Sequence, residues 1–300
     1  MQILKLKNYI FKIIAELCVW DRKNRSKLKS RWAKKHLRKY VDSAIKNVIE
    51  PSCANGVEQN ILPENSNYIW QYWQQGTNNA PPLIQRCLES TEKYHSDKKI
   101  IVLDLQKIEN YIEIPGRYYD LLNSGKMKSA HFSDILRTYL LAQYGGTWVD
   151  ATIYFTGRIP KSILNSEFFV FSKDLQIDLS ENNMSNFFIH SKPKSIVIEA
   201  IKHALNEYWK ENDFVINYFM YEHIATMLSN NEKIKEIWQK MPYYTIYDLG
   251  MLKKVLYDDF SEEKLEEIKS TSNIHKLSYK ILKDNSSGKS FYDKIINGEL

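Results

Sequence analysis

The chain has 300 residues, of which 43% are hydrophobic and 13% aromatic, so it can bury a substantial core. This composition excludes a wholly disordered protein and a disulfide-dependent miniprotein. The three cysteines, Cys18, Cys53 and Cys87, are widely spaced and form no Cys-x-x-Cys pair. This spacing argues against a disulfide framework and a structural zinc site, and it favours a reducing compartment. No apolar stretch has the length that spans a bilayer, and the N-terminus lacks a secretory signal pattern. We therefore expect a cytoplasmic protein.

The net charge of +6 is unevenly distributed. Residues 1–50 hold 14 Lys and Arg against 4 Asp and Glu, whereas the remaining 250 residues hold 28 against 32. Apolar residues recur every three or four positions over residues 6–17, with lysines among them, which predicts an amphipathic helix. A second basic run covers residues 22–39. We predict a basic helical arm over residues 1–50 and one globular domain over residues 51–300.

This basic arm has two open interpretations. Its apolar face could enter a membrane surface while each Lys or Arg near anionic lipid contributes about 1 kcal/mol. Alternatively, it is a helical extension packed on the domain with a solvated charged face. The charge would also suit nucleic acid, but we find no recognised motif and expect no nucleic-acid partner. We predict peripheral attachment to an anionic membrane, at the inner face of the plasma membrane.

Beyond the arm, residues 51–67 hold Pro, Gly, Asn and Ser among few large apolar residues and are predicted to be a linker. Strand and helix patterns then alternate. The predicted strands cover residues 68–73, 99–104, 147–155, 168–172 and 186–190. The predicted helices cover residues 82–94, 129–144, 194–210 and 215–228. This alternation predicts an α/β fold with parallel strand pairing in its first half.

Polar residues at the ends of two predicted strands mark a candidate site. Asp104 ends one strand, and Asp150 lies in the next one along the chain, after Trp148. In open α/β sheets, ligands gather at the carboxyl ends of the strands. Asp104 taken alone is also typical of a turn, and Asp150 of a turn at a strand end.

The helix before that strand carries a pair of opposite charges. Asp134 and Arg137 are three residues apart and share a face that differs from the apolar one. Gly145-Gly146 ends the helix and lets the chain turn sharply into the strand. Taken singly, Asp134 and Arg137 would be an ordinary surface ion pair of little energetic value.

Taken together, these residues resemble the core motif of GT-A-type glycosyltransferases. The shared pattern is S-D-x-x-R, a helix, Gly-Gly and an aromatic-x-Asp strand, here Ser133-Asp134-Ile135-Leu136-Arg137 and Gly145-Gly146-Thr147-Trp148-Val149-Asp150. The chain resembles the capsular polysaccharide synthesis family, which is related to transferases with a DxD-containing sugar-binding region, and more distantly the glucosyltransferase domains of large clostridial toxins. Residues 70–76, 81–101 and 274–277 resemble further family segments. The resemblance covers roughly residues 67–280 and leaves out the basic arm.

The resemblance implies a GT-A-like fold with a mixed, mainly parallel central sheet, and it implies residue roles. The implied catalytic residues are Asp134, Arg137 and Asp150. Donor-binding roles fall on Trp70, Gln71, Trp73, Asp104, Asp134, Arg137, Gly145, Gly146, Trp148 and Lys276. The acceptor side would include Asn186, Glu222 and His223.

A divalent cation, Mn²⁺ or Mg²⁺, is also implied, with Asp150 and His275 as its protein ligands. It would stabilise the negative charge that a departing nucleoside diphosphate develops. The usual D-x-D is here Asp150-Ala151-Thr152, so the second carboxylate is missing. Either the ion is held by Asp150, phosphates, waters and His275, or metal dependence is weak. We favour the first.

The implied activity is that of a hexosyltransferase. It would move a sugar from a nucleotide-sugar donor, with a UDP-sugar favoured, to a lipid-linked oligosaccharide of a bacterial capsular or surface polysaccharide, retaining the anomeric configuration. Two alternatives stay open. One is transfer to a protein acceptor. The other is a catalytically inactive, membrane-associated scaffold of polysaccharide assembly, which the degenerate metal motif would suit.

Overall fold

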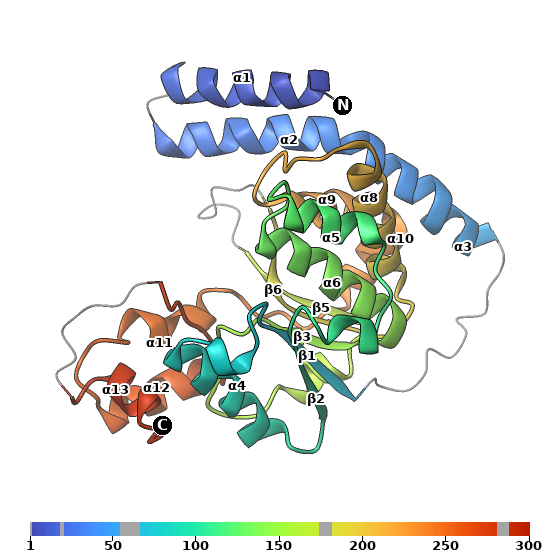
Figure 1. Cartoon of the computed structure of the whole chain (residues 1–300). Coiled ribbons are helices and arrows are strands. Elements are labelled where there is room, and N and C mark those ends of the chain that lie inside the picture. The colour runs from blue at the N-terminus through green and yellow to red at the C-terminus, as the bar shows by residue number, and fades with distance from the viewer. Residues whose placement is uncertain (1, 19–20, 55–66, 174–181, 281–287) are drawn as a thin grey trace.

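A five-stranded sheet forms the centre of the computed structural model, which describes residues 2–18, 21–54, 67–173, 182–280 and 288–300 (Figure 1). Its strand order is β2-β1-β3-β6-β5. These strands are β1 (Tyr68–Tyr72), β2 (Lys99–Leu103), β3 (Gly146–Val149), β5 (Phe168–Ser172) and β6 (Met184–Ser191). β1 pairs in parallel with β2 and β3, while β6 is antiparallel to β3 and β5, so β6 runs against the other four. The predicted α/β class and mixed, mainly parallel sheet are confirmed.

Side chains alternate between the two faces of this sheet, as the pleat of a β-strand requires. Trp70 of β1 and Trp148 of β3 belong to the largest buried cluster on one face. Their neighbours Ile69 and Val149 belong to a second cluster on the other. Both faces are therefore covered, which explains why these strands read as nearly continuous apolar runs.

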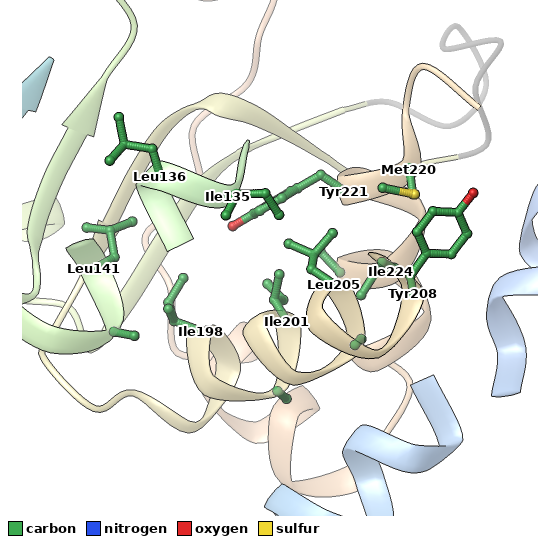
Figure 2. Packing of buried hydrophobic residues seen from close by; sticks show 14 of the residues in the cluster. Ile135, Leu136, Leu141, Ile198, Ile201, Leu205, Tyr208, Met220, Tyr221 and Ile224 are labelled. Atoms are coloured by element: carbon green, nitrogen blue, oxygen red, sulfur yellow. The ribbon is translucent and has the colours of Figure 1, made fainter. Parts of the chain in front are cut away.

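The helices of the first face pack into the largest core cluster. They are α2 (Arg22–Ala44), α5 (Gly116–Asn123), α6 (Ser129–Tyr144), α8 (Ile196–Glu211), α9 (Met220–Leu228) and α10 (Glu232–Gln239). Figure 2 shows how α6, α8 and α9 meet. Ile198, Ile201 and Leu205 are spaced three and four residues apart on α8, and they lie between side chains of α6 and α9.

The opposite face is covered by α4 (Pro82–His95) and by the C-terminal part of the chain. A small antiparallel sheet of β4 (Ile153–Phe155) and β7 (Ile274–Lys276) lies here. Four more helices pack here, namely the short α7 (Lys161–Leu164) and α11 (Met251–Lys254), followed by α12 (Glu262–Thr271) and α13 (Phe291–Ile296).

The single strand predicted over residues 147–155 is wrong. The chain forms β3, then a turn at residues 150–152, then β4, and the amide of Ile153 donates to the Asp150 carbonyl at 2.9 Å to close that turn. β4 leaves the central sheet because its edge pairs with β7, a partner that local sequence does not specify.

The helix predicted over residues 215–228 begins later, at Met220. The side-chain oxygen of Asn217 accepts from the Phe219 amide at 2.9 Å, an Asx-type turn that competes with the helical pattern. The amphipathic helix predicted over residues 6–17 begins four residues earlier, at Gln2, and the other predicted strands and helices are confirmed to within two residues.

The N-terminal arm is a pair of helices, of which the second belongs to the body. Ala33 and Leu37 of α2 are fully buried, and α2 packs against α8 and α9. α1 (Gln2–Cys18) lies along α2, where the Phe11 and Trp32 rings stack 4.2 Å apart and Trp32 Nε1 donates to Asn8 Oδ1 at 3.1 Å (Figure 1). None of the helices in the described ranges combines the length and hydrophobicity of a transmembrane span. After α2, a π-helical segment (Ile45–Ile49) leads into α3 (Glu50–Ala54). The linker predicted over residues 51–67 therefore begins as a helix, and almost all of the rest of it lies outside the described residues.

Candidate functional site

A cavity of about 800 Å³ opens at the carboxyl ends of β1 and β3. The chain reaches it at Tyr72, the last residue of β1, at Trp73 directly after it, and at Asp150 directly after β3. This is the edge where open α/β sheets bind ligands. Other described lining residues come from the segments after β1 and β3, from α6 and the residue before it, from β6, from the start of α9 and the turn before it, from α11, and from β7 and the segment after it. They are Gln74, Gln75, Lys128, Ser129, Ala130, His131, Ser133, Asp134, Arg137, Ala151, Thr152, Asn186, Tyr218, Phe219, Glu222, Lys253, Lys276, Leu277, Ser278, Tyr279 and Lys280.

The three predicted catalytic residues all line the cavity and contact one another. One guanidinium nitrogen of Arg137, Nη1, donates to Asp134 Oδ1, and the other, Nη2, lies 3.2 Å from Asp150 Oδ1. Asp134 and Arg137 are one turn apart on α6, whereas Asp150 comes from the turn after β3. The helix–glycine–strand connection therefore brings the three side chains into one network.

Two aromatic rings lie close to the Arg137 guanidinium, in addition to its hydrogen bonds. The side chain is only 4% exposed, and its guanidinium lies 5.0 Å from the centre of the Trp148 ring and 5.8 Å from that of Tyr221. Trp148 Nε1 in turn donates to Asp150 Oδ1 at 2.9 Å. Trp148 thus orients both Arg137 and Asp150 from beneath the cavity.

The electrostatics keep Asp150 ionised. Burial by itself raises the pKa of a carboxyl group, but Lys276 and Arg137 more than offset it, so the pKa of Asp150 lies below its usual value. A carboxylate with a low pKa is an acceptor and not an acid at neutral pH.

Two polar side chains lie beside the carboxylate oxygens of Asp134. Asn186 Nδ2 donates to Oδ1 at 2.8 Å, and His131 Nδ1 lies 3.4 Å from Oδ2. Asp134 is 6% exposed yet lines the cavity with Asn186. A buried carboxylate beside an amide suits recognition of hydroxyl groups, because unpaired polar atoms in such a site are costly.

An aromatic pair lies on another wall. The rings of Trp73 and Tyr279 meet edge to face, with centroids 5.4 Å apart. Trp73 Nε1 is buried and has no hydrogen-bond partner among the residues that the structure describes, so within them this indole has an N–H donor to spare. Flat aromatic groups of this kind suit a flat ring such as a nucleobase.

Lys276 connects the turn after β3 to β7. Its Nζ lies 2.9 Å from Asp150 Oδ2 and 2.5 Å from Thr152 Oγ1. Lys128, Lys253 and Lys280 also line the cavity, so five basic side chains face three acidic ones among its described residues. Such a surplus suits an anionic ligand.

The described residues do not fit the predicted divalent cation. His275 lies in β7, where its fully buried ring places Nε2 2.8 Å from Thr156 Oγ1, and it does not line the cavity. Both oxygens of Asp150 already contact cationic or N–H donors, and Thr152 Oγ1 faces Lys276. No group of three His, Cys, Asp or Glu in the described ranges could hold a metal ion.

Several predicted donor-binding residues lie outside the cavity lining. Trp70 is buried, and its Nε1 donates to the Gly145 carbonyl at 2.9 Å, while Gln71 donates to Thr91 Oγ1 at 3.1 Å. Asp104 accepts from the amides of the turn that follows it, at 3.0 Å each, and pairs with Lys107. Trp70 and Gln71 are therefore part of the protein interior, and Asp104 stabilises the turn after β2.

Gly145 and Gly146 also act at a distance from the cavity. Gly145 has a φ of 63°, and a Cβ there would lie 2.5 Å from the backbone nitrogen of Pro193. Gly146 has a φ of 95°. Only glycine therefore makes this sharp passage from α6 into β3, which in turn positions Asp150.

The three predicted acceptor-side residues differ in position. Asn186 and Glu222 line the cavity, and Glu222 pairs with Lys173 at 3.3 Å with both side chains buried. His223 is fully buried beside Asn182, with 2.6 Å between Nδ1 and Oδ1, and burial lowers its pKa to about 3. His223 is neutral at physiological pH and does not line the cavity.

Sequence reasoning missed several cavity residues, among them Tyr72, His131, Tyr218, Lys253 and Tyr279. Two of them carried a usable signal: Tyr72 ends a strand that leads into the site, and Tyr279 follows the Ile274–Leu277 segment closely. Tyr218 is 68% exposed at the cavity, and it reaches that place because α9 starts late. Lys253 had no local signal.

The family described as capsular polysaccharide synthesis protein matches residues 19–295. The chain belongs to this family. The match is wider than the resemblance expected over residues 67–280, since it includes α2 and begins after α1.

Two further similarities are weaker than this family match. A stretch of 92 residues is 27% identical to the O-glycosyltransferase braB of Annulohypoxylon truncatum, covering 28% of this chain and only 22% of that protein. The PaToxG glycosyltransferase structure aligns over 91% of this chain and 96% of its own, with 14% identity and a TM-score of 0.41. In this member of the capsular polysaccharide synthesis family, Asp134, Arg137 and Asp150 form the polar centre of the cavity.

Proposed function

We propose that this protein is a glycosyltransferase that takes its sugar from a nucleotide donor. The network of Asp134, Arg137 and Asp150 in a cavity of about 800 Å³ carries the proposal. Cavities of about 300–1,000 Å³ are typical of small-molecule sites, and this one combines hydroxyl-binding, cationic and aromatic walls. Membership of the capsular polysaccharide synthesis family supports the same class of reaction.

Three sides of the cavity would each bind one part of the donor. Asp134 and Asn186 would accept and donate hydrogen bonds to sugar hydroxyls, and the lysine side would face the diphosphate. Trp73 and Tyr279 would contact the base, for which we favour uracil. The enzyme is then a hexosyltransferase that uses a UDP-sugar.

In the proposed reaction, the bond between the sugar C1 and the phosphate oxygen breaks, and its electron pair stays on that oxygen. The acceptor hydroxyl oxygen bonds to C1 on the same face, and its proton passes to the departing phosphate. This retaining course needs no separate protein base. It agrees with a site in which the carboxylates of Asp134 and Asp150 are already engaged by Arg137 and Lys276.

The proposed acceptor is a lipid-linked oligosaccharide of a capsular or surface polysaccharide, reached at the cytoplasmic face of the membrane. Its support is α1, which carries a row of exposed apolar side chains beside its lysines: Ile3, Leu6, Tyr9, Ile10, Ile13, Ile14 and Leu17. An amphipathic helix with this composition suits an anionic lipid surface. The protein would thus work next to its lipid-linked substrate.

A screen of donor hydrolysis and transfer across a panel of nucleotide sugars tests the activity. We expect turnover with one donor class, and a loss of about 100-fold or more in Asp134→Asn, because the amide no longer accepts at both oxygens. The matched control is Asp120→Asn, an exposed aspartate on α5 that does not line the cavity. It should leave turnover unchanged.

Two results would contradict the proposal. The first is a folded wild-type chain that neither binds nor cleaves any nucleotide sugar in the panel. The second is an Asp134→Asn variant with wild-type turnover and unchanged circular dichroism.

A further inference from the structure

The ammonium group of Lys276 lies beside the Asp150-Ala151-Thr152 turn, where a divalent cation was expected. A metal ion bound by this turn would lie about 2.0–2.6 Å from oxygens of both residues. Lys276 Nζ lies 2.9 Å from Asp150 Oδ2 and 2.5 Å from Thr152 Oγ1. An ammonium group and a divalent ion cannot share that position.

The position of Lys276 is set by backbone pairing. Lys276 is opposite Ile153 in the β4–β7 register, and the amide of Leu277 donates to the Thr152 carbonyl at 2.9 Å. The ring of Phe187 lies 4.8 Å from Nζ. The lysine is therefore preorganised against the turn, which is what electrostatic stabilisation of a developing charge requires.

The lysine also remains accessible to a ligand. Its side chain is 29% exposed and lines the cavity together with Lys253 and Lys280. Threonine at position 152 fits the same arrangement, because a second carboxylate is not needed where a single positive charge replaces a double one.

We propose that Lys276 takes the place of the divalent cation, binding the donor diphosphate and stabilising the charge that the leaving phosphate oxygen gains. This inference rests on the proposed function and makes the transferase independent of metal ions. In the bond cleavage described above, Lys276 keeps its proton and forms a charge-assisted hydrogen bond to that oxygen. Asp150 and Thr152 hold the ammonium in place before the donor arrives.

Calorimetric titration with UDP, GDP, ADP and CDP tests the inference on the full chain, together with donor hydrolysis. Each is measured after dialysis against EDTA and again with added Mn²⁺ or Mg²⁺. We expect wild-type affinity and turnover to change less than about twofold between these conditions. Lys276→Met should weaken nucleoside diphosphate binding about 10- to 100-fold, without rescue by Mn²⁺, because one charge-assisted contact is lost.

Two further variants separate charge from packing. Lys276→Arg keeps the positive charge and should retain most of the diphosphate affinity. Lys254→Met, at an exposed lysine of α11 outside the cavity lining, is the matched control and should bind like wild type.

The outcomes distinguish this inference from the proposed function. Wild-type binding or turnover that falls more than tenfold in EDTA and returns with Mn²⁺ overturns the inference while the transferase proposal stands. So does a folded Lys276→Met variant that binds as tightly as wild type. Absence of nucleotide and nucleotide-sugar binding under every condition overturns both.

Discussion

Arg137 is the residue on which the site depends most. It is almost fully buried between the carboxylates of Asp134 and Asp150 and packs on Trp148. A buried charge is tolerated only when its partners offset the loss of hydration. Removing the guanidinium would leave a buried Asp134 without its cation, so the same residue that organises the site also stabilises the fold.

For Arg137→Met, we predict a free energy of unfolding lower by about 3–5 kcal/mol, measured by denaturant titration, because an uncompensated buried carboxylate remains. Arg158→Met is the matched control. Arg158 also pairs with an aspartate, Asp97, but its side chain is 65% exposed, so the change should stay within about 1 kcal/mol. Equal effects of the two substitutions would disprove this account of Arg137.

Helix α1 leaves most of its large apolar side chains exposed. Seven of the eleven exposed large hydrophobic side chains in the described residues belong to it. Its inner side is used for α2, through Asn8, Phe11 and Ala15. An apolar row that faces outward and is accompanied by lysines is complementary to an anionic lipid surface.

We predict that the triple variant Ile10→Gln, Ile13→Gln, Ile14→Gln loses most of its co-sedimentation with anionic liposomes while keeping donor hydrolysis. These residues are 41–51% exposed, and glutamine preserves helix propensity, so the fold should survive. Tyr243→Gln, at a residue 77% exposed away from α1, is the control.

Unchanged liposome binding by the triple variant would contradict the membrane role of α1. A shift from dimer to monomer in light scattering, with liposome binding unaffected, would instead identify the apolar row as a contact between two copies. Deleting the whole arm would be a poor test, because Ala33 and Leu37 of α2 belong to the main core.

Three buried histidines in separate elements of the fold make its stability depend on pH. Burial lowers the pKa of His190 to about 4 and the pKa values of His223 and His275 to about 3. They lie on β6, α9 and β7. Because the native chain keeps them neutral, the unfolded chain, where histidine has a pKa of about 6.5, binds more protons over the intervening range.

We predict that the free energy of unfolding falls as pH is lowered from 6.5 to 4, by about 1.4 kcal/mol per pH unit for each of these histidines. Their contribution is fully present above pH 7, where both states are neutral. Chemical denaturation at several pH values measures this slope. His223→Gln should reduce the slope by about 1.4 kcal/mol per pH unit, which corresponds to one proton fewer bound by the unfolded chain. Stability that is flat between pH 7 and pH 5 would show that these histidines titrate normally.

Much of the fold follows from local pattern. The three- and four-residue spacing of apolar side chains predicted α6 to the residue and α4 to within one, because a helix shows its buried face in its own sequence. The strand predicted over residues 147–155 was wrong at the turn. Ala151 and Thr152 are too similar to strand residues to show, from the local sequence, that the strand is divided there. What divides it is β7, which lies more than a hundred residues away.

The site divides in the same way. Asp134, Arg137 and Asp150 could be assigned to one network because a single short segment carries all three, and the structure joins them. His275 and Lys276 are adjacent in sequence, but alternate residues of a strand point to opposite faces. One is therefore buried beside Thr156, and the other reaches Asp150.

The α/β class, the amphipathic helix of the arm and the motif of the capsular polysaccharide synthesis family can be recognised from the sequence, since each depends on residues close together in the chain. Which cationic side chain contacts Asp150 could not be recognised in this way. That choice depends on the register of β7 against β4, and register is set by hydrogen bonds and packing between segments that are distant along the chain.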